Sequence, residues 1–368
     1  MEKNNNRDVR LKSRAKKCLK GNEIEYQNET LIIPSRYTYK GVWNWDSMFH
    51  AIAVSDWDLS LALAQIKYFT ERQAENGMYY DAFLTNGKIF KFISKPPVVA
   101  WALSEIMKKH PNGVDIDYFY RTLSKNIKFW ETYRLKNGLF SYDSFAPEET
   151  YEIHCKCESG WDNSVRWDRG AEKLWAIDLN SYMALTYKIL SDFALKLGLQ
   201  KESEQWSEKY QVLGKKINEK LWCEEIGAYC DYDFISNEFT KVVSPASFFP
   251  LFANVADFAK ASALKKLAED ERKFFPLFPT VSYDDKDYSS SDYWRGPTWL
   301  NVSYFALKGL KNYGFNEIFD GYKNRLLDMC DKEKRGLFEY YDSRTGKGLG
   351  AKQFGWTAAF VLQFINEI

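Results

Sequence analysis

Short segments that combine glycine, aromatic residues and aspartate recur along this chain, separated by long stretches with helical periodicity. From Gly41 to Gly336 they repeat at a mean of about 59 residues, a length that accommodates two helices and two loops. Repeats of this length predict stacked helix pairs. Ordinary turn chemistry after helices is the alternative explanation. Five copies are clear and a sixth is degenerate: GVWNWD (41–46), GMYYD (77–81), GLFSYD (138–143), GAYCDYD (227–233), GLFEYYD (336–342) and FPTVSYDD (278–285).

The stretches between these segments are amphipathic and predict about a dozen helices. Six helix pairs would close into an all-α (α/α)₆ barrel, with short β segments at the end where the aromatic–Asp segments gather. We expect residues 1–368 to form one catalytic domain, with 1–30 as a helical N-terminal extension packed on it. The clear helices are 56–76, 114–137, 176–198, 201–222, 255–270, 298–314 and 354–368, and the weaker ones are 8–19, 47–55, 97–109, 245–252 and 315–330. Helix starts are indicated by Asp46, Asp178 and Asp257, and helix ends by Gly77, Gly138, Gly198 and Gly314.

Charge and hydropathy exclude several classes of protein. The 51 basic and 50 acidic residues leave no electrostatic signal for nucleic acid or an anionic membrane. No apolar run is long enough to cross a bilayer, and the polar, basic first residues do not resemble a secretory signal. Six scattered cysteines are typical of reduced thiols, so we expect a cytoplasmic protein.

Aromatic residues make up 17% of the chain, including 13 Trp and 24 Tyr. Tyr and Trp carry polar groups that need partners, and their rings match the apolar faces and polar rims of sugars. The composition therefore suggests a carbohydrate ligand, although a Tyr-rich core is the alternative.

Three segments place a carboxyl group among aromatic rings, where burial would perturb its pKa. In YKGVWNWDSMFH (39–50), Asp46 could contact a substrate or simply cap a helix. In CESGWDNSVRWD (157–168), Asp162 follows Trp161 in a loop and could hold its proton as a general acid, or form an Asx turn. Glu339, in RGLFEYYDSRTGKGLGAKQFGW (335–356), could point to the barrel mouth from a short strand or lie on an exposed hairpin.

Other chemistries have fewer candidates. The chain has only three His, and His154-Cys155-Lys156-Cys157 lacks the spaced second half of a zinc site, so we expect no metal. No dinucleotide-binding or phosphate-binding glycine loop and no nucleophile elbow are present, and we expect no organic cofactor.

Four motifs, in order from about residue 30 to the C-terminus, resemble glycoside hydrolase family 63 and, more distantly, the trehalases of family 37. They are YKGVWNWDSMFHAIA (39–53), ESGWDNSVRWD (158–168), YWRGPTWLNVSYFALKGLKNYG (293–314) and FEYYDSRTGKGLGAKQFGWTAA (338–359). The resemblance extends to mannosyl-oligosaccharide glucosidases and mannosylglycerate hydrolases, and it implies an inverting glycosidase on an (α/α)₆ barrel.

The resemblance also implies roles for individual residues. The general acid falls on Asp162 and the general base on Glu339. The residues expected to contact the sugar are Tyr39, Trp43, Trp45, Asp46, Trp161, Arg166, Trp294, Arg295 and Trp356. In the implied single displacement, Asp162 protonates the glycosidic oxygen while Glu339 deprotonates the water that attacks the anomeric carbon from the opposite face.

One departure concerns Lys95, which stands in Ser94-Lys95-Pro96-Pro97 where relatives commonly have Gln. Lys can only donate a hydrogen bond and brings a charge that is costly to bury unpaired. We expect Lys95 either to pair with a carboxylate at the pocket wall or to meet an anionic substrate such as a glycerate glycoside. The alternative is a side chain in solvent.

The substrate expected from these observations is a small, possibly anionic, α-linked carbohydrate of the α-glucoside or α-mannoside type. A trehalase-like or glycerate-glycoside hydrolase is the alternative enzyme. A carbohydrate-binding barrel without catalysis is the alternative of another class.

Overall fold

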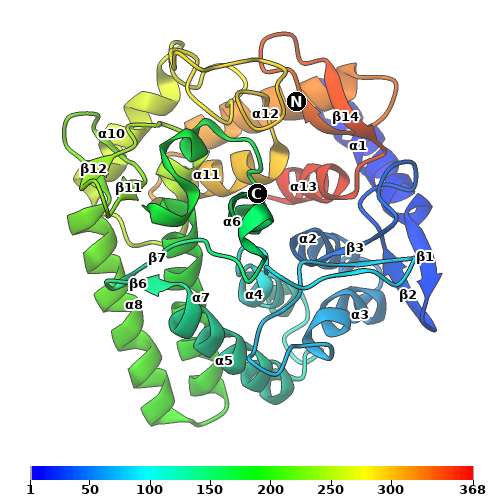
Figure 1. The fold of residues 1–368 in the computed structure, drawn as a ribbon. Helices are drawn as coiled ribbons and strands as arrows, with labels where there is room; N and C mark the ends of the chain where they lie inside the picture. The colour runs from blue at the N-terminus through cyan, green and yellow to red at the C-terminus, as the bar shows by residue number, and fades with distance from the viewer. Residues whose placement is uncertain (1, 368) are drawn as a thin grey trace.

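The computed structural model describes the backbone of residues 2–367 and the side chains of residues 6–367. Within this range, two concentric rings of helices alternate along the chain (Figure 1). The inner ring is closed, because each of its helices packs on the next and the last packs on the first. Its members are α2 (Asn44–Val54), α4 (Val99–Lys109), α7 (Ile177–Lys196), α9 (Phe249–Phe252), α11 (Leu300–Asn312) and α13 (Gly355–Asn366).

The outer ring covers the inner one, with α3 on α2, α5 and α8 on α7, and α12 on α11. The first helix lies against α12 and α13, so the segment suggested as an extension forms one of the outer helices. The (α/α)₆ barrel inferred from the repeat is therefore confirmed. The outer helices are α1 (Glu2–Gly21), α3 (Leu59–Thr70), α5 (Ile116–Tyr133), α8 (Gln200–Lys220), α10 (Phe258–Glu269) and α12 (Asn316–Lys332).

The sequences of the two rings differ as their surroundings require. Every residue of α2 is buried, as expected for a helix with neighbours on all sides. In α8 the buried residues are few, and its other faces are polar. Three outer helices begin with carboxylate caps, since Asp58, Asp115 and Asp257 each accept a hydrogen bond from the first turn of α3, α5 and α10.

Two other aspartates do not cap helices as expected. The N-cap of α2 is Trp43 and that of α7 is Ala176, which places Asp46 and Asp178 inside the first turn. Both carboxyl groups are buried. The Asp178 carboxylate accepts hydrogen bonds from Arg166 and Tyr142, whereas Asp46 lines the pocket described below.

The aromatic–Asp segments form strands and turns that connect the helices. Copies at 41, 138, 227 and 336 contribute β3, β7, β10 with β11, and β13, whereas the degenerate copy at 278–285 forms bends and turns. All pairings are antiparallel, in the sheets β1-β2, β3-β4-β5, β6-β7, β8-β11-β12, β9-β10 and β13-β14. The strands are β1 (Glu23–Tyr26), β2 (Glu29–Ile32), β3 (Gly41–Trp43), β4 (Ala82–Leu84), β5 (Ile89–Phe90), β6 (Leu135–Lys136), β7 (Leu139–Phe140), β8 (Leu174–Trp175), β9 (Trp222–Cys223), β10 (Ala228–Tyr229), β11 (Tyr232–Asp233), β12 (Glu238–Phe239), β13 (Phe338–Tyr341) and β14 (Gly348–Lys352).

One helix was not expected from the sequence. α6 (Glu148–Ser159) belongs to neither ring, and in Figure 1 it crosses the centre of the view. Its sequence, EETYEIHCKCES, is polar and buries only Cys155, Glu158 and Ser159, so it lacks the apolar period that reveals a helix. The segment 245–252 also differs from expectation, because a 3₁₀ turn, Pro245–Phe248, precedes the short α9.

Aromatic rings fill the interior of the barrel. Phe49 of α2 packs against Trp101 of α4, Phe305 of α11 and Phe360 of α13, with ring centroids 4.9–6.3 Å apart. Part of the high aromatic content is therefore core packing. Among residues 2–367, no helix has both the length and the apolar character needed to cross a membrane.

Candidate active site

A pocket of about 420 Å³ lies at the end of the barrel where inner helices begin. Asp46 comes from the first turn of α2, Lys95 precedes α4, Trp294 precedes α11, and Trp356 lies in the first turn of α13. Two carboxyl groups predicted to be catalytic, Asp162 and Glu339, are in its wall. The lining consists of Pro34, Tyr39, Trp43, Trp45, Asp46, Lys95, Gly160, Asp162, Tyr293, Trp294, Glu339, Phe354 and Trp356.

Asp162 is held by the segment that follows α6. The helix ends at Gly160, whose φ of +76° turns the chain in the left-handed conformation that glycine adopts readily. A Cβ at this position would lie 2.5 Å from the ring of Trp45, so the glycine also makes room for the pocket wall.

The residue after Asp162 is also fixed. The Asn163 side chain donates to Asp292 at 3.0 Å and accepts from the backbone N–H of Trp294 at 2.8 Å. Asp162 is therefore held between the end of α6 and the loop that precedes α11.

Glu339 occupies an irregular position in the β13–β14 hairpin. The register shifts between Phe338 and Tyr340, so Gly350 and Ala351 together face Glu339 in a β-bulge. Gly350 has a φ of +70°, and a Cβ there would lie 2.6 Å from Oε2 of Glu339. The bulge directs the Ala351 N–H to Oε2 at 2.9 Å. The carboxylate thus occupies space that only a glycine leaves open.

The two carboxyl groups differ in their hydrogen-bond donors. Glu339 accepts from the Ala351 N–H, from the Tyr39 hydroxyl at 2.7 Å and from the Tyr293 hydroxyl at 3.4 Å. Burial raises the pKa of Glu339 above its ordinary value, and these three donors limit the rise. Burial also raises the pKa of Asp162, which is countered by the Lys95 ammonium and its own backbone N–H. Donors from several residues favour a charged Glu339, while Asp162 has less support for its charged form.

Aromatic rings form most of the remaining wall. Trp45 packs edge-on against Trp356, with centroids 5.4 Å apart, and lies 6.4 Å from Trp294. Tyr39 contacts Trp43 and Phe354 in the same edge-on manner. Such rings can cover the apolar face of a sugar.

Asp46 is almost completely buried, and its Oδ1 has no hydrogen-bond partner among the described residues. Burial raises its pKa well above the ordinary range, with Lys95 acting in the opposite direction. An unsatisfied buried oxygen is costly unless a ligand or water meets it. Asp46 is thus available to accept a hydrogen bond from a hydroxyl group in the pocket.

Lys95 does not extend into solvent. Its side chain is 8% exposed, its Nζ lies 3.6 Å from Asp81 Oδ1, and it donates to the carbonyl oxygen of Cys157. Burial alone would lower the pKa of Lys95, but Asp81 and Asp162 outweigh this effect and raise it, so the ammonium is retained. We expected Lys95 either to pair with a protein carboxylate or to meet an anionic substrate, and in the structure it pairs with the carboxylate of Asp81.

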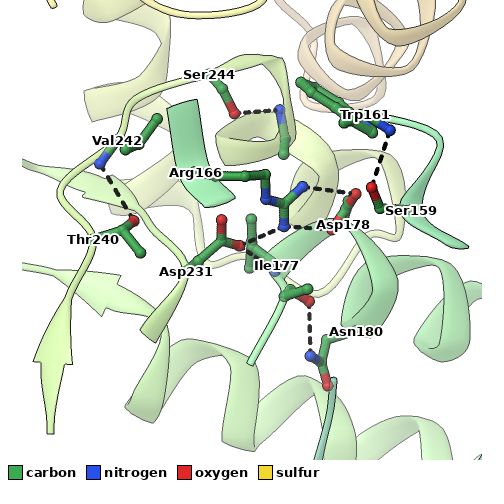
Figure 2. Close-up of polar contacts among 12 residues, drawn as sticks. Ser159, Trp161, Arg166, Ile177, Asp178, Asn180, Asp231, Thr240, Val242 and Ser244 are labelled. Atoms are coloured by element: carbon green, nitrogen blue, oxygen red, sulfur yellow. Dashed lines mark hydrogen bonds and ion pairs between the residues drawn. The ribbon is translucent and has the colours of Figure 1, made fainter. Parts of the chain in front are cut away.

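Arg166 is not part of the pocket lining, which corrects the expectation for this residue. Figure 2 shows its guanidinium between Asp178 and Asp231. The hydrogen bonds to Asp178 measure 2.8–2.9 Å and the one to Asp231 measures 2.7 Å. Asp231 also accepts the Ile177 N–H at 2.8 Å, which fixes the start of α7. A buried arginine needs such partners, and its two terminal nitrogens join η1 (Val165–Arg169), α7 and the segment before β11.

Arg295 and Trp161 also lie outside the lining. Arg295 pairs with Asp168 at 3.0 Å on the protein surface. Trp161 is completely buried and packs behind Trp294 with centroids 5.2 Å apart, so it supports a lining residue rather than lining the pocket. The remaining sugar-contact candidates, Tyr39, Trp43, Trp45, Asp46, Lys95, Trp294 and Trp356, do line it.

Four lining residues were not selected from the sequence: Pro34, Gly160, Tyr293 and Phe354. Tyr293 precedes Trp294 in a motif already noted, and its φ of +39° is unusual for a tyrosine. That conformation cannot be read from the sequence, although its position in the motif could have identified it.

Comparison with known proteins identifies the family. The chain matches the model of the mannosylglycerate hydrolase MGH1-like glycoside hydrolase domain over residues 39–357. It belongs to this glycoside hydrolase family. Proteins similar to this chain include mannosylglycerate hydrolase from Rubrobacter radiotolerans, which is 25% identical over 91% of this chain and 92% of its own length.

Solved structures agree with the MGH1-like assignment. The family 63 mannosylglycerate hydrolase from Thermus thermophilus, in complex with glucose, is 25% identical with a TM-score of 0.81, covering 96% of this chain and 99% of its own. Neutral trehalase from Saccharomyces cerevisiae shares the fold, with a TM-score of 0.74 at 19% identity over 94% of this chain and 76% of its own.

Proposed function

We propose that this glycoside hydrolase cleaves a small α-linked glycoside by single displacement, with Asp162 as the general acid and Glu339 as the general base. The observation that carries the proposal is the difference between the two carboxyl groups in one pocket. Burial raises the pKa of both groups. Three hydrogen-bond donors oppose this rise at Glu339, which favours the charged form that a base requires, whereas only Lys95 and one backbone N–H oppose it at Asp162.

In this mechanism, Asp162 gives its proton to the glycosidic oxygen as the bond from that oxygen to the anomeric carbon breaks. Glu339 takes a proton from a water molecule, whose oxygen forms the new bond to the anomeric carbon. Tyr39 and Tyr293 hold the Glu339 carboxylate through their hydroxyl groups. Trp45, Trp356 and Trp294 cover the sugar, and Asp46 accepts from one of its hydroxyl groups.

The charges of the pocket favour a neutral sugar beside Lys95. Asp46, Asp81 and Asp162 lie close enough to influence this ammonium, which is the one cation among the described lining residues. A substrate carboxylate placed there would meet these acidic groups with no free cation to balance it. An acidic aglycone, such as the glycerate in the relatives' names, would have to lie nearer the opening.

The substrate is proposed to be of the α-glucoside or α-mannoside type. The named relatives include a mannosylglycerate hydrolase and a periplasmic trehalase from Salmonella that is 24% identical over 94% of this chain and 70% of its own length. We also propose a cytoplasmic location, because the six cysteines are free thiols, which a reducing compartment maintains.

The test is a proton NMR assay of α-glucosides, α-mannosides, trehalose and glycerate glycosides. We expect the first sugar released to be the β-anomer, since single displacement inverts the configuration. Asp162→Asn and Glu339→Gln should each abolish turnover while circular dichroism and sugar binding stay close to the wild type. Release of the α-anomer would exclude the mechanism, and near-normal activity in either variant would exclude that residue. Sugar binding without turnover of any of these substrates would favour a non-catalytic barrel.

A further inference from the structure

The segment before α4 is attached to the last turn of α6 at two points. The Ser94 N–H donates to Glu158 Oε1 at 3.1 Å, and the Lys95 ammonium donates to the Cys157 carbonyl oxygen. Glu158 is completely buried and also pairs with Arg134 at 2.8 Å. Lys95 is joined to Asp81, next to β4, by the ion pair described above.

The end of α6 depends on such attachments. The helix is polar and buries little, so apolar packing contributes little to its position. A cation near the carbonyl groups of a final turn interacts favourably with the helix dipole. The Cys157 carbonyl oxygen accepts both the Gly160 N–H at 3.0 Å and the Lys95 ammonium. From Cys157 the chain passes through Gly160 directly to Asp162. A displacement of this turn would therefore also displace the proposed general acid, which follows a few residues later.

We propose that Lys95, paired with Asp81, is a positioning residue that fixes the end of α6 and thereby aims Asp162 at the glycosidic oxygen. This inference rests on the function proposed for Asp162. It assigns Lys95 to the organisation of the acid, and not to recognition of an anionic substrate.

Lys95 also acts on the charge of Asp162. The ionisable groups that act electrostatically on Lys95, Asp81 or Asp162 come from several elements: Asp46 on α2, Asp81 before β4, Lys95 before α4, Cys157 and Glu158 on α6, Tyr293 before α11, and Glu339 on β13. Lys95 is the cation among them and lowers the pKa of Asp162. Because the acid must be protonated, its pKa sets the basic limb of the pH profile of kcat.

The experiment compares two substrates of the same sugar, an α-glycosyl fluoride and the methyl α-glycoside. Fluoride leaves without much help from an acid, whereas an alkoxide needs a proton. We expect Lys95→Gln to lower kcat on the methyl glycoside by about 10- to 100-fold, within the range that general acid catalysis contributes, and to leave the fluoride nearly unaffected. The ratio of the two rates does not depend on how much of the variant is folded. Equal losses on both substrates would overturn the proposal.

The pH profile gives a second, directional test. Lys95→Gln should move the basic limb of kcat to higher pH, because the pKa of Asp162 rises. Asp81→Asn, which frees Lys95 to act on Asp162, should move it to lower pH. If the basic limb moves in the same direction in the two variants, or moves in neither, the proposal is contradicted. Asp81→Asn still provides the test if Lys95→Gln does not fold.

The chain offers a matched control in Lys109. Its ammonium donates to the Ile52 carbonyl oxygen in the last turn of α2, at 3.1 Å, and pairs with Asp56 at 2.5 Å, outside the pocket lining. Lys109→Gln removes a similar helix-end contact. It should change neither the ratio of the rates on the two substrates nor the basic limb of kcat.

Asp162→Asn, measured in the same assays, separates the assignment of Asp162 as the acid from the positioning role of Lys95. If that variant does not lose methyl glycoside turnover selectively, the acid assignment fails, whereas a failure of Lys95→Gln alone refutes only the positioning role.

Discussion

The Tyr39 hydroxyl donates a 2.7 Å hydrogen bond to Oε1 of Glu339, a residue 300 positions later in the chain. This bond lowers the pKa of Glu339, which must be deprotonated to act as a base. Tyr39→Phe should therefore raise that pKa and move the acidic limb of kcat/KM to higher pH. We expect a shift of about one to two pH units, because a hydrogen bond to a charged group contributes about 1.5–3 kcal/mol.

The measurement is the pH profile of kcat/KM for both proteins. Tyr37, two residues earlier, is 74% exposed, and Tyr37→Phe is the control that should leave the profile unchanged. An acidic limb that stays in place in Tyr39→Phe would show that the phenol does not control the base.

Gly350→Ala tests the bulge that holds Glu339. The added Cβ would meet Oε2 at 2.6 Å and would force the carboxylate away from the Ala351 N–H. We expect kcat to fall by at least about 10-fold, since misplacement of a catalytic group by a small distance is costly. Gly227→Ala is a close control, because Gly227 has a φ of +68° but open space around its Cβ. Both variants should lose about 1–2 kcal/mol of stability from the left-handed backbone. Similar kcat values in the two variants would contradict the proposed role of the bulge.

The fold was largely predictable because its long helices have apolar residues at regular spacing. The limits of 177–196 and 300–312 differ from the expected 176–198 and 298–314 by only a few residues. α6 was missed because it has no apolar face of its own and its position depends on contacts with distant residues. Lys95 donates to the Cys157 carbonyl oxygen, and Ser94 and Arg134 bind Glu158. Sequence periodicity reports apolar burial and contains no information on such polar attachments.

The site was predictable where a carboxyl group or tryptophan belongs to a recognisable motif, as for Asp162, Glu339 and Trp45. Arg166 was misjudged because its partners, Asp178 and Asp231, lie 12 and 65 residues away and only the fold brings them together. The same limitation applied to Lys95, for which the sequence permitted a protein partner, an anionic substrate or solvent. The ion pair with Asp81 distinguishes among these environments.

Arg166→Met should destabilise the protein strongly. The change leaves Asp178 and Asp231 buried without their cation, a situation that costs about 3–5 kcal/mol in other proteins. Arg121→Met, which removes an exposed pair with Asp117, should cost less than about 1 kcal/mol. Urea unfolding at pH 7 measures both free energies. The deficit of Arg166→Met should shrink as the pH falls, because burial raises the pKa of Asp231 and the loss of the guanidinium would raise it further, and a neutral Asp231 no longer needs a cation. A deficit that is small, or that does not depend on pH, would show that these carboxyl groups find other partners.

His50 should make the free energy of unfolding depend on pH. It is completely buried, and a Cβ at Gly355 would lie only 2.2 Å from its Nε2, so a charged ring has no room for water. Burial lowers its pKa to about 3 from an ordinary value of 6.5. Above pH 6.5 the ring is neutral in both the folded and unfolded states and contributes no pH dependence. Between pH 6.5 and about 3 the unfolded chain binds a proton that the folded protein does not. Stability should therefore fall with decreasing pH, by about 1.4 kcal/mol per pH unit from this group.

His50→Gln removes this contribution. Comparison of urea unfolding at pH 7 and pH 5 should show the stability difference between wild type and variant changing in the variant's favour by about 2 kcal/mol, as the linkage relation requires. His154→Gln, on α6, controls for the loss of a histidine elsewhere in the protein. A difference between wild type and His50→Gln that stays constant over this interval would mean that the folded protein accepts a proton at His50. That proton would then be held through the backbone of Ile32, whose hydrogen bond raises the pKa of His50 against the effect of burial.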